Sequence, residues 1–254
     1  MGFRVVLTSI CLILSPTLGG AAPFDPTTFI NATNEVISDL TAFVGLGADL
    51  HAYESTKPYS SKVGFDAGVS ATAIGIPGKV VKGLTDLGIP NVPRFLPLPK
   101  INIQKAINRR LFVGSEFIPS IKVGGNTISL YGFDLQYTLI ERPRLPPIAI
   151  RGQYNYANLA FIQAATYGGD VLTSFKLLFI DIYGGGGYRL VKGTISNPTV
   201  TIPRIPGVNF DATVDAGHFF GGVSLVAGFF RLTGEANFTT RGVNTYGAKL
   251  SFFF

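Results

Sequence analysis

The 254-residue sequence is poor in charged residues, histidine and cysteine, and it contains no tryptophan. Only 14% of the residues are charged, whereas a typical soluble domain carries about 25%. The hydrophobic share of 46% is ordinary, so the shortage of charge is what raises the mean hydropathy to +0.35. A chain with this much apolar surface and a formal net charge of only +6 is not intrinsically disordered. Its length fits one all-β domain as well as two smaller domains.

The single cysteine, Cys11, lies in a short apolar run near the start of the sequence. Arg4 precedes this run and small residues follow it up to Ala21, an arrangement typical of a secretory signal peptide. We therefore expect residues 1–21 to be removed after export. The run is too short to cross a bilayer as a helix, because about 20 apolar residues are needed. The mature chain would then have no cysteine, which excludes disulfides and cysteine-ligated metals.

Beyond residue 22 the sequence has no run that is long and apolar enough for a transmembrane helix. Instead, apolar residues occupy every second position, as in 131–139 and 246–254, and this period predicts β-strands. The sequence predicts ten strands, at 42–54, 60–76, 110–123, 127–140, 147–157, 161–176, 179–194, 217–229, 231–241 and 244–254.

Two architectures have strands with one apolar and one polar face: a soluble sandwich and a transmembrane barrel. Here the polar faces consist of Gly, Ser, Thr, Asn and Gln with few charges, whereas a solvated sandwich face carries more Lys and Glu. The strands are also long enough to cross a bilayer at a tilt of about 45°. We therefore predict an all-β transmembrane antiparallel up-and-down β-barrel of about ten strands over residues 42–254.

The chain ends in a phenylalanine that is preceded by apolar residues at every second position. This ending resembles the C-terminal signature by which the barrel-assembly machinery recognises bacterial outer-membrane barrels. The positions that match it most clearly are Tyr246, Leu250, Phe252 and Phe254. The resemblance implies that the protein is located in the bacterial outer membrane, with outer-membrane lipid and the assembly machinery as partners.

The connection 77–109 does not fit the ten-strand scheme. With the C-terminus in the periplasm, this connection falls on the periplasmic side, where turns are usually short. It is either a true insertion, or it hides another hairpin and the barrel has about twelve strands. Its prolines, including Pro97 and Pro99, argue against a continuous helix or a central strand.

Positive charge is concentrated in the same region, since 77–110 holds seven basic residues and one acidic residue. One interpretation is an anionic partner, either lipid headgroups or an anionic solute drawn towards a pore. The other is a solvated connector whose charges keep it out of the bilayer. A nucleic-acid partner is excluded, because export takes the chain out of the compartment that contains nucleic acid. The four basic residues chosen for testing are Lys100, Lys105, Arg109 and Arg110.

The N-terminal piece, residues 22–41, differs from the rest. Asp25 as a cap and Pro26 at the first position predict a helix that runs to Leu40. Its apolar stripe would either plug the lumen from the periplasmic side or pack under the barrel rim.

Motifs for chemistry are almost absent. His51 and His218 fall on the polar faces of their predicted strands, without the spacing of a metal site. Ser224 lies about 20 Å along the strand from His218, which is too far for a catalytic pair. The run 184–187 is four glycines without the Lys-Ser/Thr of a phosphate loop, so we expect it to allow bending or close approach. We therefore expect no enzyme activity, cofactor or metal.

Three segments carry a family resemblance: KPYSSKVGFDAGVS (57–70), ISLYGFDLQYTL (128–139) and YGGGGY (183–188). They resemble an uncharacterised family of Gram-negative outer-membrane β-barrel proteins. That family has a signal peptide, a short N-terminal helix and a barrel of this size. The resemblance implies fold and location, and it brings no substrate or catalytic residue.

Two functions follow from these features. The first is a narrow passive channel or transporter for small solutes, favoured by the Gly-rich polar faces and an N-terminal plug. The alternative is a structural or surface-display barrel with a closed lumen, because a barrel of this size is barely wider than its own side chains. Charges of both signs are predicted to face the lumen, where they could pair across it. These are Asp66, Asp134, Arg151, Asp181, Arg189, Glu235 and Lys249.

Overall fold

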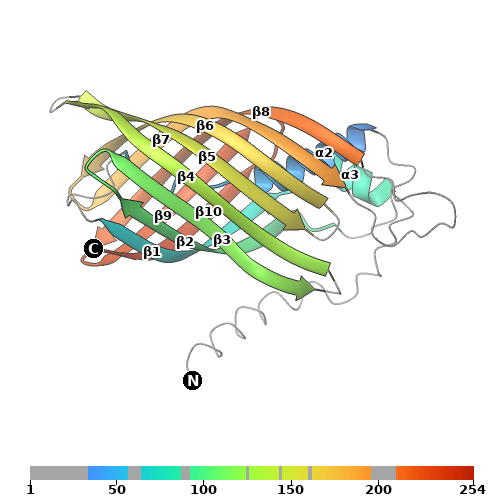
Figure 1. Ribbon diagram of the computed structural model, residues 1–254, viewed down its shortest axis with the longest axis horizontal. Coiled ribbons are helices and arrows are strands. Elements are labelled where there is room, and N and C mark those ends of the chain that lie inside the picture. Colours follow the sequence, from blue (N-terminus) through green and yellow to red (C-terminus); the bar gives the residue numbers. More distant parts are fainter. Residues whose placement is uncertain are drawn as a thin grey trace, which may run out of the picture.

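The computed structural model describes residues 34–56, 64–86, 92–123, 126–142, 145–159, 162–195 and 210–254. Within this part of the chain, ten antiparallel strands form one closed barrel (Figure 1). Each strand pairs with its neighbours in sequence, and β1 pairs with β10 to close the sheet. This arrangement confirms the predicted up-and-down barrel.

The elements have the following bounds. The helices are α2 (Asn34–Gly47) and α3 (Gly78–Asp86), and the strands are β1 (Phe65–Gly75), β2 (Phe95–Ala106), β3 (Leu111–Val123), β4 (Asn126–Arg142), β5 (Leu145–Leu159), β6 (Ile162–Leu177), β7 (Ile180–Ile195), β8 (Phe210–Ala227), β9 (Phe230–Thr239) and β10 (Thr245–Phe253). Nine of the ten predicted strands correspond to β1 and β3–β10.

The two faces of each strand differ sharply. In β10, Lys249 points into the barrel and is completely buried, whereas the next residue, Leu250, points outward and is about half exposed. The same alternation runs along the other strands, so the outside of the barrel is covered with exposed apolar side chains. Examples from five strands are Val69, Phe133, Val171, Leu232 and Phe252.

The prediction of a first strand at 42–54 is wrong. This region instead contains the end of α2 and an irregular stretch, Ala48–Thr56, that lies inside the barrel. The alternation in 44–52 has two sources. Its first part reflects glycines on the helix, and its second part belongs to a segment that is enclosed on all sides. The alternation therefore does not mark one apolar and one polar face of a sheet.

The connection 77–109 hides one strand, which restores the number to ten. It contains α3, then β2, and it crosses the full barrel wall. Prolines are tolerated in β2 because of where they lie: β2 pairs with β3 only from Ile101 to Ala106, so Pro97 and Pro99 stand outside that ladder. Their missing N–H groups therefore cost no hydrogen bond to β3.

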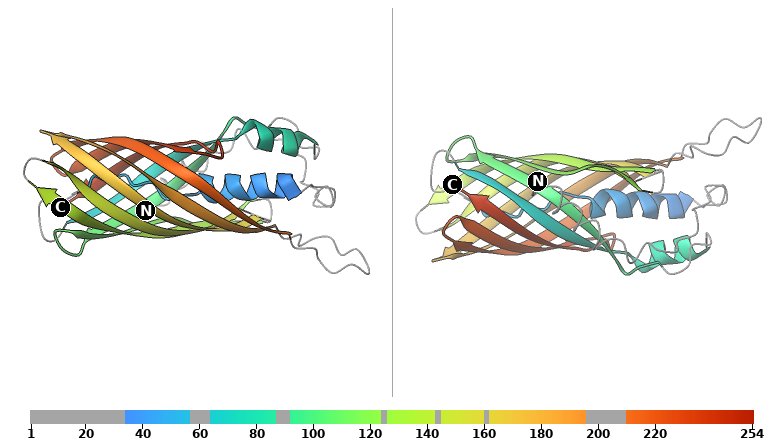
Figure 2. Two further views of the ribbon diagram at one scale, coloured as in Figure 1. Left: turned by 90° about the horizontal axis from the view of Figure 1, so that it is seen from above. Right: turned by 90° about the horizontal axis from the view of Figure 1, so that it is seen from below.

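The two helices lie at the end of the barrel opposite the C-terminus (Figure 2). Asp66 of β1 pairs with Phe253 of β10, so β1 starts at the end where the chain finishes and runs away from it. The segment that holds α3 follows β1 and is therefore at the far end. The prediction that 77–109 shares a side with the C-terminus is wrong.

Helix α2 enters the barrel with its C-terminal half. It extends to Gly47, beyond the predicted end at Leu40, and its inner turns bury Leu40 and Val44 in the main apolar cluster. Glycine permits this fit, because a Cβ on Gly45 would overlap the side chain of Val191. The expected signal peptide and the first part of the predicted helix, residues 1–33, lie outside the described residues.

Candidate functional site

The lumen is occupied by the stretch Ala48–Thr56, which we call the luminal strap. It continues from α2 towards the end of the barrel that holds the C-terminus. Thr166 donates to the carbonyl of Gly45 just before the strap, and Ser174 contacts Thr56 at its end. These two β6 residues are eight positions apart, or about 26 Å along a strand. The strap therefore runs through much of the barrel's length.

The wall side chains hold the strap by its backbone. Four consecutive strap carbonyls accept hydrogen bonds from amide, ammonium and guanidinium groups that point inward from β2 and β5. The bonds are Asn155 to Ala48 (2.7 Å), Lys100 to Asp49 (3.0 Å), and Arg151 to both Leu50 and His51 (3.2 Å each). These contacts satisfy strap carbonyls that would otherwise be buried without partners.

One carboxylate, Glu235 of β9, holds the middle of the strap. Its two oxygens accept from the backbone N–H groups of Ala52 (3.1 Å) and Tyr53 (2.7 Å). Tyr183 and Asn237 donate to the same carboxylate at 2.7 and 3.0 Å. Tyr53 has a φ of 47°, a left-handed conformation that few residues with side chains adopt. The strap thus bends where two successive amides meet Glu235.

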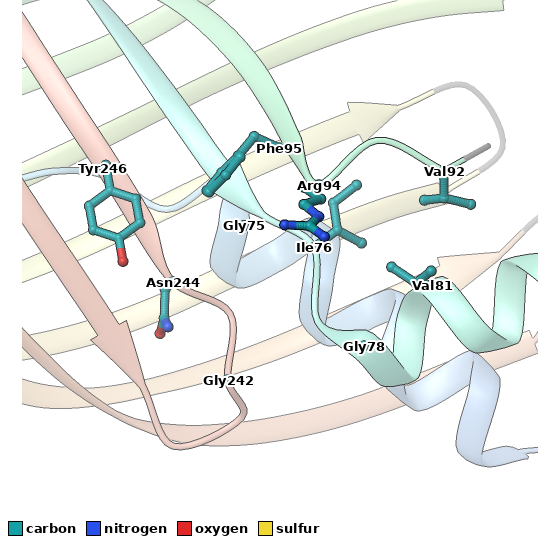
Figure 3. Close-up of a pocket in the computed structure, with 10 residues that line it drawn as sticks. All are labelled: Gly75, Ile76, Gly78, Val81, Val92, Arg94, Phe95, Gly242, Asn244 and Tyr246. Atoms are coloured by element: carbon teal, nitrogen blue, oxygen red, sulfur yellow. The ribbon is translucent and has the colours of Figure 1, made fainter.

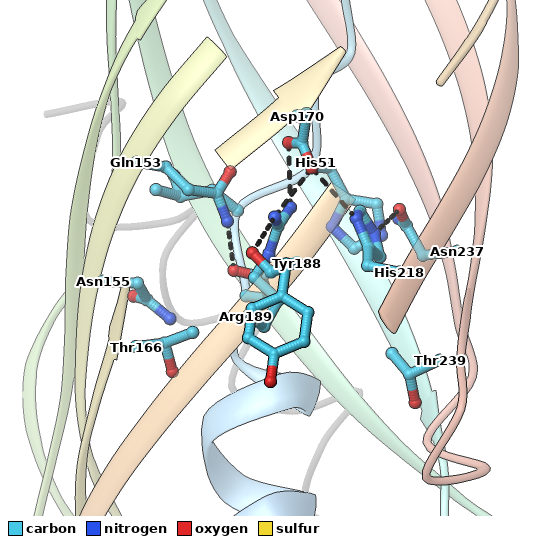
Figure 4. Close-up of polar contacts among 12 residues, drawn as sticks. His51, Gln153, Asn155, Thr166, Asp170, Tyr188, Arg189, His218, Asn237 and Thr239 are labelled. Atoms are coloured by element: carbon cyan, nitrogen blue, oxygen red, sulfur yellow. Dashed lines mark hydrogen bonds and ion pairs between the residues drawn. The ribbon is translucent and has the colours of Figure 1, made fainter. Parts of the chain in front are cut away.

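An ion cluster anchors the first part of the strap (Figure 4). Arg189 donates from Nε to Asp49 at 2.6 Å and from its two other nitrogens to Asp170 at 2.7 and 2.9 Å. Arg151 lies 3.9 Å from the same Asp170, and His218 Nδ1 lies 3.4 Å from it. The cluster ties a strap carboxylate to side chains from four strands of the wall.

A second ion cluster anchors the last part of the strap. Lys249 lies 2.7 Å from Asp66, and Arg231 lies 3.3 Å from the same carboxylate. Strap residue Glu54 completes the cluster, at 3.5 Å from Arg231 and 4.0 Å from Lys249. Since all four groups are buried, each charge depends on the others for compensation.

The seven residues predicted to face the lumen all point inward. Six of them belong to the network around the strap: Asp66, Asp134, Arg151, Arg189, Glu235 and Lys249. Asp134 reaches the network through Arg151 at 3.4 Å. Asp181 lies apart from it, and its ion pair at 4.0 Å is with the exposed Lys176.

Several members of the network were not singled out from the sequence. Asp49 and Glu54 fall in the wrongly predicted strand 42–54. His51, considered above only as a metal ligand, is part of the strap and stacks on Tyr53. Asp170 could have been found, because the alternation of β6 places it on the same face as Thr166.

The four basic residues chosen from 77–110 do not form one patch. Lys100 is buried in the lumen, 2.8 Å from Glu116. Lys105 is exposed near the end of β2, and Arg109 and Arg110 are exposed in the turn after it. The concentration of charge in the sequence is dispersed because β2 carries it across the whole barrel.

Three of the four residues of the predicted assembly signal lie on the outer face of the barrel. Tyr246, Leu250 and Phe252 are about half exposed on the outer face of β10. Phe254 exchanges backbone hydrogen bonds with Phe65 at 2.8 and 3.0 Å, and the two rings are 5.5 Å apart. The last residue therefore helps to join the two ends of the sheet.

Little space remains between the strap and the wall. One enclosed cavity, lined by residues that include Asp49, His51, His218 and Asn237, has no room for a water molecule. The glycine run contributes to this packing, since the Phe220 ring fills the space beside Gly185 and belongs to the same apolar cluster as Ala52.

The described residues include no set of three or more His, Cys, Asp or Glu side chains placed to hold a metal ion. No helix among them combines the length and apolar character that crossing a membrane requires. Fold and site together define a closed ten-strand barrel whose lumen is filled by its own N-terminal segment.

No family model and no curated protein matches the sequence. Among solved structures, the N-terminal β-barrel domain of Pseudomonas aeruginosa OprF is similar at 11% identity, over 74% of this chain and 97% of that one, with a TM-score of 0.35. The outer-membrane protease OmpT of Escherichia coli is similar at 10% identity, over 76% and 96%, with a TM-score of 0.39. Yersinia pestis Ail is similar at 11% identity, over 76% and 100%, with a TM-score of 0.34. At these values the assignment of the fold rests on the chain's own strand pairing.

Proposed function

We propose that the protein is an outer-membrane barrel that keeps its lumen closed with its own N-terminal segment and displays α2 and α3 at the cell surface. The observation that carries the closed lumen is the double anchoring of the strap, by Asp49 at one end and Glu54 at the other. This is the structural, surface-display alternative, and it takes precedence over the channel because the strap occupies the path that a solute would follow.

The outer face of the barrel supports a membrane location. A soluble protein seldom exposes a large continuous apolar surface, whereas a barrel in lipid requires one. Here half-exposed apolar side chains such as Phe133 and Val171 surround the sheet, whereas Asp134 and Asp170 of the same two strands point inward. A bilayer would bury the first set and leave the second in the polar interior.

The orientation follows from the C-terminal residues. If Phe252 and Phe254 are read by the assembly machinery, the end of the barrel that holds them faces the periplasm. The helices lie at the opposite end, and so they face the outside of the cell. The strap then runs through the lumen from the surface side towards the periplasmic end, where β1 starts.

Conductance in planar bilayers tests the closed lumen. We compare the mature chain with deletions of residues 22–41 and 22–56, because the first keeps the strap and the second removes it. The full chain and the variant that lacks residues 22–41 should not conduct ions, whereas the variant that lacks residues 22–56 should conduct them. Heat-dependent migration in SDS gels shows whether each barrel has folded. A full chain that conducts as well as the 22–56 deletion would refute the closed lumen and support the channel.

Labelling of single cysteines in intact cells tests the orientation. The expected mature chain has no cysteine, so Glu35→Cys on α2 and Arg109→Cys at the other end are clean probes. Both positions are exposed. A membrane-impermeant maleimide should label Glu35→Cys in intact cells, and Arg109→Cys only after the outer membrane is permeabilised. The reverse pattern would overturn the proposed orientation.

A further inference from the structure

A groove of about 600 Å³ lies beside α3 at the helix end of the barrel (Figure 3). It is formed where β1 ends, β2 begins and the chain enters β10. The backbone fixes these walls: Ile76 donates to the carbonyl of Arg94 at 3.0 Å, and Gly75 donates to that of Asn244 at 2.7 Å. The groove is therefore preformed.

The lining combines an apolar floor with positive charge. Ile76, Val81 and Val92 supply aliphatic surface, and the exposed Arg94 supplies a guanidinium. Among the described residues that line the groove, none carries a carboxylate. Helix α3 begins at Gly78 in the same wall, so the positive end of its dipole is also directed there. This combination is complementary to a ligand with an apolar body and an anionic head.

The groove is continuous with the apolar outer face of the barrel. Phe95 and Tyr246 line it, and both are about half exposed on that face. Their rings meet edge to face at 6.4 Å, and Phe238 meets Tyr246 in the same way at 6.2 Å. Aromatic groups of this kind mark the level of the headgroups at a membrane surface.

We propose that this groove binds one lipid with a phosphate headgroup, the phosphate at Arg94 and an acyl chain along Phe95 and Tyr246. The inference rests on the proposed membrane location but not on a closed lumen. The ligand class follows from the charge and the position: a guanidinium binds phosphate well, and the adjoining apolar face leads into the hydrocarbon layer.

The test is a lipid titration of the purified, folded full barrel in neutral detergent, followed by native mass spectrometry. The probes are dioleoyl phosphatidate, dioleoyl phosphatidylcholine and inorganic phosphate. Arg94→Gln removes the charge. Gly78→Trp fills the groove, since a Cβ at Gly78 would meet nothing within 4 Å. Arg110→Gln, an exposed arginine at the other end of the barrel, is the matched control.

The wild type should bind one phosphatidate saturably and more tightly than phosphatidylcholine. Arg94→Gln should weaken that binding about tenfold, the loss expected for a hydrogen bond to a charged group. Gly78→Trp should abolish it, and Arg110→Gln should leave it unchanged. Equal binding by all three variants and the wild type would overturn the site. Inorganic phosphate that binds as tightly as the lipid would overturn the lipid as its ligand. Conductance and cysteine labelling are separate readouts, so either proposal can fail alone.

Discussion

The inner and outer faces of this barrel are made by the same strands, yet they are stabilised in different ways. Inside, charges such as Asp66 and Arg189 are buried and paired, often with residues more than 100 positions away in the sequence. Outside, side chains such as Val171 make no specific polar contact and require only an apolar surrounding. An inner position thus depends on particular partners, whereas an outer one depends on its depth in the membrane.

The largest effect should come from breaking an inner cluster. Arg189→Met leaves Asp49 and Asp170 buried without their main partner, which we expect to lower the free energy of unfolding by about 3–5 kcal/mol. Urea unfolding in detergent micelles measures this. Arg142→Met, at an exposed arginine at the end of β4, should change little. Equal losses in the two variants would show that the inner face has no such dependence on partners.

On the outer face, the cost of introducing a charge should depend on its depth in the membrane. Val171→Arg, near the middle of β6, should cost about 2–4 kcal/mol, because a charge at the bilayer midplane is poorly solvated. Leu177→Arg, at the end of the same strand, should cost about 0–1 kcal/mol. Reversible unfolding from phospholipid vesicles gives both values. If the two substitutions cost the same, the outer face is not in a bilayer.

Substitution of the C-terminal residue should reduce assembly in the membrane much more than it reduces the stability of the folded barrel. Phe254→Ala retains the backbone bonds to Phe65 and loses only the contact of the rings, so the free energy of unfolding should fall by no more than about 1.5 kcal/mol. The amount of folded protein in the outer membrane should fall much further, because the ring is part of the proposed assembly signal. Quantitative gel analysis of membrane fractions, heated and unheated, compares the two. An unchanged yield would contradict the signal.

The smallest effect should come from the exposed basic residues. Changing Lys105, Arg109 and Arg110 together to Gln should alter the free energy of unfolding by only about 0.5 kcal/mol, as is usual at exposed sites. Lys100→Gln should cost more, since it leaves Glu116 buried beside a weaker partner. The same unfolding assay ranks the two variants. A larger loss in the triple variant would show that the exposed charges act together.

Much of this fold is predictable from the period of the sequence. Nine strands were recognised because one face of each is apolar, and the alternation also gives the side on which Asp66 or Lys249 lies. β2 was missed because prolines normally exclude a paired strand, and only its unpaired stretch beside β3 explains their presence. That exception depends on where the ladder between β2 and β3 ends, which local sequence does not encode.

The strap could not be predicted in the same way. Its residues contact the wall on every side, so the alternation in its sequence does not correspond to an apolar and a polar face that would identify it. Asp49 has its partners on β5 and β7, and Glu54 has its partners on β9 and β10. These pairings exist only after the barrel has formed, and they follow from tertiary structure alone.

The luminal position of the strap constrains the order in which the molecule folds. Closure of the sheet joins Asp66 to Phe253, the contact with nearly the largest separation along the described chain. Such long-range contacts form slowly, because the entropy of loop closure must be lost first. A strap with a helix at one end cannot easily be threaded into a cylinder that is already sealed. We therefore expect the strands to assemble around the strap, and the pairing of β1 with β10 to close last.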